Sequence, residues 1–321
     1  MSRKIRRILV AIRDLDRVSR AQLRKAATVA RLAGARLELF HADGTPMLPE
    51  RGGTAGAQSD RIAQRSQRRL ERLRKARVFA GLKVTCQAVR DYPPHEAVVR
   101  RAVQAKADLV VAASRTHHLG QRFLLLNTDW ELIRNCPCPV LFIKSARDYR
   151  RPALLAAVDP FHVHAKPARL DRQLLATGGA LAGVLRGQLH VFHAYLPLAM
   201  SFVAPLEQAP VWLPPGAEEA NTAQVARAFN RLAQSAGIPR GRRHLEMGDV
   251  PGRLLATVQR IRAGIVVMGA VSRSGIRRVF IGSTAERVLD ELRCDVLVVK
   301  PRGFRTTVSR VRSPLVGATL Y

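Results

Sequence analysis

The chain has 321 residues, enough for about two domains of ordinary size, each with its own hydrophobic core. A hydrophobic fraction of 47% excludes a largely disordered chain. Lys and Arg number 54 against 24 Asp and Glu, so the net charge is +30, and both halves carry the excess. Such a charge indicates either a solvated, arginine-rich surface or contact with an anionic partner, such as a nucleic acid or an anionic surface.

The cysteines are few and scattered. Cys86, Cys136, Cys138 and Cys294 lack the density of a disulfide framework, which favours a reducing compartment. The apolar run after the basic N-terminus ends at Arg13 and is too short for a signal peptide. No uncharged run is long enough for a membrane-spanning helix. We therefore expect a soluble, cytoplasmic protein without a transmembrane segment.

Residues 1–148 alternate short apolar runs with helical patterns. Runs that are apolar throughout are typical of parallel strands covered by helices on both faces. The predicted strands are 8–12, 37–41, 84–89, 109–113 and 140–143, and the predicted helices are 17–33, 60–80, 95–106 and 127–135. The pattern predicts an α/β domain with a doubly wound sheet.

Residues 149–302 repeat this plan. The predicted strands of this part are 153–158, 189–195, 243–247, 265–268 and 296–299. A shift of 156 residues aligns 108–144 with 264–300 without a gap, and the predicted strands coincide. The sequence therefore predicts a duplication, with domains at 1–148 and 149–302. We expect a loose tail over 303–321, where the apolar periodicity fades.

The second domain contains a glycine motif at the edge where open parallel sheets bind ligands. A predicted buried strand runs into Met268 and Gly269, and Gly282-Ser283-Thr284 opens the next helix. Glycine allows close approach of the backbone, and a helix start offers N–H groups to an anion. The pattern suits a phosphate group, although the same residues also fit a plain helix start with a Ser or Thr cap.

Several segments around this motif carry a family resemblance. They are Ala263–Gly269, Phe280–Asp290 and Leu292–Pro301, together with Thr128–Val140 in the first domain. In these segments the chain resembles the universal stress protein family, most of all its tandem-domain E type. The resemblance extends over both domains and is weakest at 44–60 and 196–220.

The resemblance implies two Rossmann-like, doubly wound parallel-sheet domains, each with the strand order 3-2-1-4-5. Members of the family commonly pair edge to edge through their last strands. Here the closing strands, Val140–Lys144 and Val296–Lys300, are both present in one chain. We expect them to pair as an internal pseudo-dimer, because an exposed apolar edge strand invites aggregation. The protein would then be a monomer with an internal pseudo-dimer, or a homodimer.

The resemblance also implies a nucleotide site. In members that bind nucleotides, an Asp closes the first strand and a Gly-x2-Gly-x9-Gly-Ser/Thr pattern holds the phosphates. In the second domain it assigns ligand binding to Asp159, Met268, Gly269, Ser272, Gly282, Ser283 and Thr284. Ser272 replaces the middle glycine, so we expect weak binding of ATP or another adenine nucleotide, or a different ligand in the same crevice.

The first domain departs from that pattern. The 156-residue offset places Ala113, Thr116, Leu126 and Asn127 at the motif positions, and Arg13 stands where the first-strand Asp would be. We expect this domain to be a structural partner or the wall of a different pocket. The sequence shows no nucleophile–base pair, so we predict ligand binding or signalling under stress rather than an enzyme, with at most slow nucleotide hydrolysis.

The segment 61–77 is strongly basic, with eight basic residues and one acidic residue. One interpretation is a helix with a solvated basic face. The other is an anion-binding surface for a nucleic acid or an anionic surface, formed by Arg61, Arg65, Arg68, Arg69 and Arg72. Cys136-Pro-Cys138 lacks the usual Cys-x2-Cys spacing of metal ligands, and we expect no metal site.

Overall fold

The structure is a computed structural model, and it describes residues 4–44, 55–114, 127–161, 170–198, 213–270 and 288–311. Four residues of the predicted nucleotide motif lie outside the described residues. They are Ser272, Gly282, Ser283 and Thr284.

The N-terminal half, residues 4–144, alternates strands and helices in the predicted order. Its elements are β1 (Arg7–Ala11), α1 (Arg20–Ala33), β2 (Arg36–Asp43), α2 (Ala55–Arg74), η1 (Arg77–Phe79), β3 (Val84–Arg90), α3 (Pro94–Gln104), β4 (Leu109–Ala113), α4 (Asn127–Asn135) and β5 (Val140–Ile143). The largest difference from the prediction is at α2, which ends at Arg74, before the short 3-10 helix η1.

The C-terminal half repeats this order. Its elements are β6 (Ala153–Ala157), α5 (Leu170–Val184), β7 (Gln188–Tyr195), α7 (Ala217–Ser235), η2 (Arg240–Arg242), β8 (Arg243–Met247), α8 (Val250–Arg260), β9 (Ile265–Gly269) and β10 (Asp295–Val299). Residues 288–291 are also helical and precede β10.

Local signals in the sequence set several helix ends. The Ser19 hydroxyl accepts a hydrogen bond from the Gln22 amide at 3.2 Å and starts α1. The helix ends at Gly34, whose φ of 63° lies in the left-handed region that favours glycine. In the other half, the Asp249 carboxylate accepts from the Gly252 amide at 2.8 Å and starts α8.

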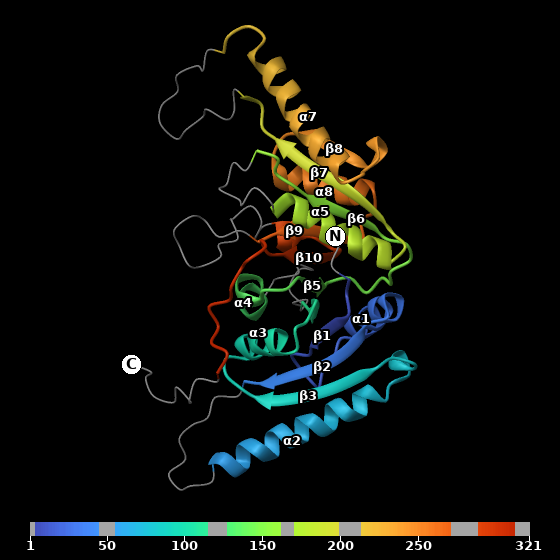
Figure 1. The fold of residues 1–321 in the computed structure, drawn as a ribbon, viewed down its shortest axis with the longest axis vertical. Coiled ribbons are helices and arrows are strands. Elements are labelled where there is room, and N and C mark those ends of the chain that lie inside the picture. The colour runs from blue at the N-terminus through green and yellow to red at the C-terminus, as the bar shows by residue number, and fades with distance from the viewer. Residues whose placement is uncertain are drawn as a thin grey trace, which may run out of the picture.

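The ten described strands form one sheet, in the order β3-β2-β1-β4-β5-β10-β9-β6-β7-β8 (Figure 1). Each half keeps the predicted order 3-2-1-4-5, and the halves meet where β5 and β10 pair antiparallel, with Leu141 opposite Leu297. This confirms the internal pseudo-dimer. Joining two like edges reverses the strand direction, so the two parallel halves form one mixed ten-stranded sheet.

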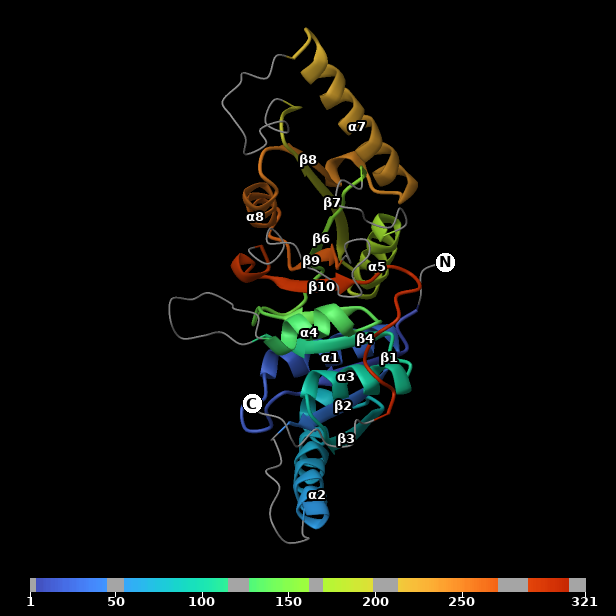
Figure 2. The ribbon, with the colours of Figure 1, turned by 90° about the vertical axis from the view of Figure 1, so that its left-hand side faces the viewer.

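Helices cover both faces of the sheet (Figures 1 and 2). On one face, side chains of α3, α4 and α8 pack on the strands, with Val99, Ile133 and Leu254 in the core. On the other face, α1, α2, α5 and α7 do the same, with Leu70 and Phe229 among the buried residues. The fold is therefore a three-layer α/β/α arrangement, which explains the continuously apolar strands.

A buried carboxylate joins the two halves. Asp295 on β10 accepts hydrogen bonds from Lys25 Nζ on α1 at 2.5 Å and from the Tyr149 hydroxyl at 2.6 Å. The backbone amides of Lys144 and Ser145 donate to the same carboxylate, each at 2.9 Å. The side chains of Lys25 and Asp295 are 1% and 0% exposed. Burying such an ion pair carries a large desolvation penalty. The surrounding hydrogen bonds offset that penalty, so the loss of any of them should destabilise the junction.

Two lysines cross the junction in a matched way. Lys144, next to β5, donates through Nζ to the Leu289 carbonyl of the other half. Lys300, next to β10, donates to the Arg134 carbonyl near the end of α4 at 3.0 Å. Burial lowers the pKa of Lys144 to about 8 and that of Lys300 to about 7.

The chain beyond Lys300 lies against the N-terminal half. Arg100 Nη1 donates to the Ser309 carbonyl at 3.2 Å, and Phe304 and Val308 pack against the core. Residues 303–311 have no helix or strand, and Phe304 and Val308 are the apolar side chains that hold this segment to the surface. Residues 312–321 lie outside the described part of the chain.

Within the described residues, no helix combines the length and the apolar character that crossing a membrane requires.

Candidate functional site

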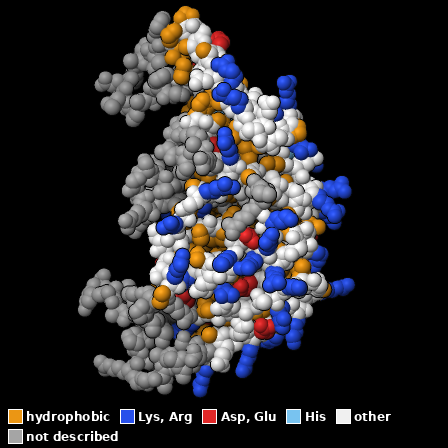
Figure 3. Space-filling view, in the orientation of Figure 1, with side chains coloured by type: hydrophobic (Ala, Val, Ile, Leu, Met, Phe, Trp, Pro, Cys, Tyr) orange, Lys and Arg blue, Asp and Glu red, His pale blue; other side chains and the backbone are white. Residues whose placement is uncertain are grey.

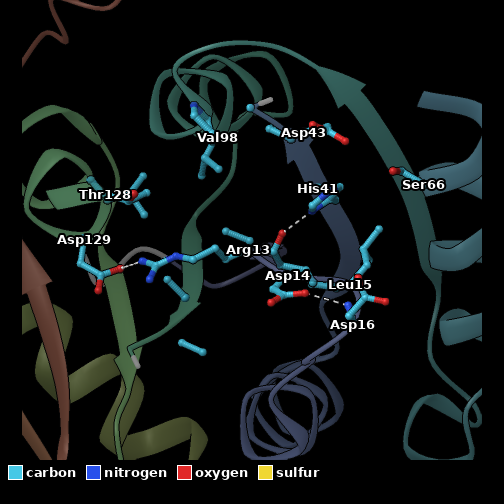
Figure 4. A pocket seen from close by; sticks show the side chains of 18 of the residues that line it. Arg13, Asp14, Leu15, Asp16, His41, Asp43, Ser66, Val98, Thr128 and Asp129 are labelled. Carbon is cyan, nitrogen blue, oxygen red and sulfur yellow. Dashed lines mark hydrogen bonds and ion pairs between the residues drawn. The ribbon is translucent and has the colours of Figure 1, made fainter. Parts of the chain in front are cut away.

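A cavity of about 570 Å³ opens at the carboxyl ends of β1, β2 and β4 in the N-terminal half. Its wall includes the segment 11–16 after β1, the end of β2, Ser66 and Arg69 of α2, and Thr128 and Asp129 of α4. Figure 4 shows side chains of this wall around the opening, among them Ser66, Thr128 and Asp129. Ligands of open parallel sheets bind at this edge, and a cavity of this size fits a small organic molecule.

Arg13 crosses the cavity to α4. In Figure 4 its side chain points away from Asp14 and His41 and toward Asp129. The Arg13 Nη2 atom donates to the carboxylate of Asp129, which is fully buried. The other terminal nitrogen, Nη1, is buried and has no hydrogen-bond partner among the described residues. Arg13 therefore neutralises a buried carboxylate at the place where the second half has Asp159.

His41 forms part of the opposite wall. Its ring is 8% exposed and its Nδ1 lies 2.8 Å from the Ile12 carbonyl oxygen. A carbonyl can only accept, so Nδ1 carries a proton, and in the neutral ring Nε2 is an acceptor. No partner for Nε2 is recorded among the described residues. The strand ends thus fix the orientation of the His41 ring at the cavity wall.

The acidic side of the cavity is formed by the turn after β1. Asp14 accepts hydrogen bonds from the backbone amides of Asp16 and Arg17, at 2.8 and 3.2 Å, which fixes the turn. Arg69 of α2 donates to the Asp16 carboxylate and, at 3.0 Å, to the Leu15 carbonyl. The hydrogen bond from Arg69 lowers the pKa of Asp16, so Asp16 stays ionised at neutral pH.

The C-terminal half brings part of its predicted site together. Asp159 follows β6 and Gly269 ends β9, and these two strands are neighbours in the sheet. The Asp159 carboxylate accepts from the Phe161 amide at 3.3 Å. His193 repeats the contact of His41, because its Nδ1 lies 3.1 Å from the Val158 carbonyl oxygen.

Two predicted residues of this site have packing roles. Met268 is 9% exposed and belongs to the hydrophobic core. A Cβ added at Gly269 would lie 2.8 Å from Leu170 Cδ2 of α5. The space that a side chain at 269 would need is therefore filled by α5. A role of Gly269 in ligand binding stays a prediction.

Four of the five arginines of the predicted anion-binding surface on α2 are exposed. Arg61, Arg65, Arg68 and Arg72 are exposed. Arg69 instead points to the turn after β1 and lines the cavity. Figure 3 shows Lys and Arg side chains distributed over most of the visible face, with few acidic side chains between them. The arginines of α2 are therefore one part of a widely basic surface.

The Cys-x-Cys segment is buried behind α4. Cys136 Sγ lies 3.6 Å from Cys138 Sγ, and this contact lowers the pKa of Cys136. Among the described residues, no three His, Cys, Asp or Glu side chains form a cluster suited to a metal ion.

Sequence reasoning missed the cavity residues His41, Asp14 and Asp129. A signal for His41 was present, because Phe40-His41-Ala42 recurs as Phe192-His193-Ala194 at the end of the matching strand. The partnership of Arg13 with Asp129 had no such signal, since it depends on the position of α4 relative to β1.

Comparisons with known proteins agree with the architecture. The model of the family described as "Universal stress protein family" matches residues 4–144 and 163–300. Universal stress protein E of Escherichia coli is 31% identical over 235 residues, covering 71% of this chain and 72% of the relative. The protein of that name from Photorhabdus laumondii is 27% identical over 318 residues, covering 95% of this chain and 98% of the relative.

Solved structures give the same result. A Pseudomonas aeruginosa protein described as functionally unknown is 26% identical with a TM-score of 0.68, covering 92% of this chain and 93% of that one. A universal stress protein of Archaeoglobus fulgidus has a TM-score of 0.64 at 16% identity, covering 91% of this chain and 98% of that one, which supports the fold alone.

Proposed function

The chain belongs to the universal stress protein family, and from this premise we propose that it acts under stress by binding small ligands rather than through a catalytic cycle. The cavity of about 570 Å³ at the carboxyl ends of β1, β2 and β4 carries this proposal. It has apolar walls with a few buried polar groups, which is the usual composition of a small-molecule site. A cytoplasmic location remains part of the proposal.

Native mass spectrometry of the purified full chain tests this function. We expect a small molecule to copurify with the wild type and to be lost from Ala113→Phe, in which the new ring fills the cavity at the end of β4. Ala80→Phe, at an exposed position outside the cavity, is the matched control. A copurifying molecule that stays bound to Ala113→Phe, or none in the wild type, would contradict the use of this cavity.

For the C-terminal half we propose weak binding of an adenine nucleotide. The crevice would lie between Asp159, Gly269 and the helix start at Gly282-Ser283-Thr284, with Ser272 and Met268 beside it. Support comes from the neighbouring positions of β6 and β9, whose carboxyl ends flank the point where the strand order reverses. Ser272 in place of a glycine would cost a close phosphate contact, on the order of 1–3 kcal/mol or about 5- to 150-fold in affinity.

Isothermal titration with ATP tests the nucleotide site. Ser272→Gly should bind ATP more tightly than the wild type, and Gly282→Val should bind it less tightly, because a side chain would block the helix start. If the wild type and Ser272→Gly bind ATP equally, Ser272 does not weaken the site; if none of the three proteins binds ATP, the motif acts only as a helix start.

A second function is favoured by the exposed arginines of α2. Arg61, Arg65, Arg68 and Arg72 lie on one helix, whose acidic residues are Asp60 and Glu71, and Glu71 pairs with Arg74. They could hold the phosphates of a nucleic acid, whose binding weakens with salt by a slope of about −0.9 per phosphate contact on duplex DNA.

Salt-dependent retention on immobilised duplex DNA tests this second function. Arg65, Arg68 and Arg72 changed to Gln should elute earlier and show a flatter salt dependence. The matched control changes three exposed arginines elsewhere, Arg227, Arg231 and Arg240, to Gln. Equal effects of the two triple variants would leave only a general, solvated basic surface.

A further inference from the structure

The thiols of Cys136 and Cys138 lie against each other just beyond the end of α4. Their sulfurs are 3.6 Å apart, and residues 137 and 138 form a bend between α4 and β5. Pro137 stands between them, and its fixed φ restricts the short loop that the two thiols share. A disulfide needs its sulfurs at about 2.05 Å, so the pair has to close by roughly 1.5 Å, which side-chain rotation can supply. The bend therefore holds two thiols close to bonding geometry.

The other half of the chain supplies positive charge beside this pair. Lys300 Nζ donates to the Arg134 carbonyl at 3.0 Å and lies 4.5 Å from the centre of the Phe304 ring. The contact with Cys138 lowers the pKa of Cys136 although Cys136 is fully buried, and the charge of Lys300 acts in the same direction. Because the thiolate is the nucleophilic form, Cys136 is the sulfur of the pair that attacks an oxidant.

The C-terminal half provides the contrast. At the 156-residue offset Cys138 corresponds to Cys294, and Cys136 corresponds to Leu292, which supplies no second thiol. Burial raises the pKa of Cys294 to about 12 and that of Cys86 to about 11. These two single cysteines are therefore protonated at neutral pH and are poor nucleophiles.

Burial restricts what can react with the pair. Cys136 has no exposed surface and Cys138 is 7% exposed. A protein disulfide or a bulky electrophile cannot approach sulfurs held in this way, whereas hydrogen peroxide, which is little larger than water, needs only a local opening of the loop. The site therefore favours the smallest two-electron oxidants.

We propose that Cys136 and Cys138 form a redox modification site, in which hydrogen peroxide converts the two thiols into a reversible intramolecular disulfide. The Cys136 thiolate attacks one peroxide oxygen, the O–O bond breaks, and the sulfur becomes a sulfenic acid. The hydroxide that leaves takes up the proton that Cys136 released on ionisation. The Cys138 thiol then attacks the sulfenic sulfur, so the S–S bond forms, the S–O bond breaks and water leaves. Two thiols have then lost two electrons and two protons, and one peroxide has become two waters.

The state of this pair reaches the junction between the halves. Burial lowers the pKa of Lys300 to about 7, and the nearby charge of Cys136 counteracts this lowering. A disulfide carries no such charge, so oxidation shifts Lys300 further toward its neutral form. The proposal is independent of ligand binding in the cavity of about 570 Å³.

Mass spectrometry of the reduced full chain, treated with hydrogen peroxide and then denatured and alkylated with N-ethylmaleimide, tests the proposal. Cleavage after Arg134 and Lys144 leaves both cysteines in the peptide 135–144. We expect this peptide to lose two hydrogen atoms, to escape alkylation and to recover both thiols with dithiothreitol. Its thiols should disappear at least about 10-fold faster than those of Cys86 and Cys294, because one pKa unit changes the thiolate fraction tenfold.

Two variants separate the roles of the sulfurs. Cys138→Ser keeps a hydrogen-bond donor for Cys136 but removes the second sulfur, so the product should be a sulfenic acid that dimedone traps. Cys294→Ser is the matched control, because it removes the corresponding thiol of the other half, and it should leave the disulfide unchanged. The proposal is overturned if the wild-type peptide keeps both thiols, if Cys86 and Cys294 react as fast, or if the wild type yields a sulfinic acid in place of the disulfide.

Discussion

The two halves of the chain share a frame but differ in charge at the same point. In both, a histidine on the second strand contacts the carbonyl of the residue directly after the first strand, His41 with Ile12 and His193 with Val158. The next residue is Arg13 in one half and Asp159 in the other. Duplication has therefore kept the geometry of the strand ends, while the ionisable residue that follows has changed sign.

The fourth strands differ in a second way. β4 ends in Ala113, which lines the cavity, whereas β9 ends in Gly269, whose missing side chain leaves room for Leu170. The helix that follows the first strand thus approaches the C-terminal crevice closely. We infer that the two crevices differ in how closely the nearest helix packs, as well as in charge.

The largest effect should come from the junction, where the halves are joined by a group that only one of them supplies. Asp295 has Pro139 as its counterpart at the 156-residue offset. Asp295→Asn leaves Lys25 buried without its counter-charge, so we expect the free energy of unfolding to fall by about 3–5 kcal/mol. Urea denaturation measures this, and the exposed Asp148→Asn should cost less than about 1 kcal/mol. Equal losses would contradict a role of Asp295 as the central contact.

The two lysines that cross the junction, Lys144 and Lys300, should make the stability of the protein depend on pH. The pKa of Lys300 is about 7 in the folded protein against an ordinary value of 10.5. Between these values the unfolded chain binds more protons, so stability rises with pH, by at most about 1.4 kcal/mol per pH unit. Below pH 7 Lys300 is charged in the folded protein as well, so the full free-energy cost of burying this charge lowers the stability.

Lys300→Met should remove that slope, so any stability advantage of the variant at pH 7 shrinks as the pH rises. In the comparison with Lys144→Met, the pH range over which the stability of the wild type rises should begin at about pH 8, where the pKa of Lys144 lies. Denaturant unfolding across this pH range measures both. A pH dependence that is the same in the wild type and in Lys300→Met would show that Lys300 does not titrate in this window.

The smallest change in the free energy of unfolding should come from exchanging the residues that end the fourth strands, Gly269 of β9 and Ala113 of β4. Gly269→Ala places a methyl group against Leu170, and such overpacking should cost about 1–3 kcal/mol in thermal or urea unfolding. The cost should be smaller in a Leu170→Ala background, which opens the space. The reverse exchange in the other half, Ala113→Gly, should cost about 0.5–1 kcal/mol through backbone entropy alone. A Gly269→Ala penalty that Leu170→Ala does not change would refute the packing explanation.

The sequence carries the frame of this fold in local patterns. Continuous apolar runs such as Leu109–Ala113 predict buried parallel strands, and their recurrence predicts the duplication and the pairing of the closing strands. The N-terminal cavity was only partly foreseen, as the wall of a different pocket. The charge of Arg13 was visible in the sequence, but its engagement by Asp129 was not, because 116 residues separate the two.

Other features depend on direction and long-range packing. Arg69 belongs to the same basic run as Arg65 and Arg68, and only the position of α2 beside the turn after β1 shows that it points inward. The pair of Lys25 and Asp295 is separated by 270 residues. Periodicity reports which face of an element is apolar, but it does not report which polar groups meet across elements.

Equilibrium dialysis tests most directly the claim that two equivalent folds hold non-equivalent crevices. The full chain would be dialysed against ATP over a range of concentrations. We predict at most one ATP site per chain, because Arg13 stands in the first half where the second half has Asp159. Two equivalent ATP sites per chain would contradict the account.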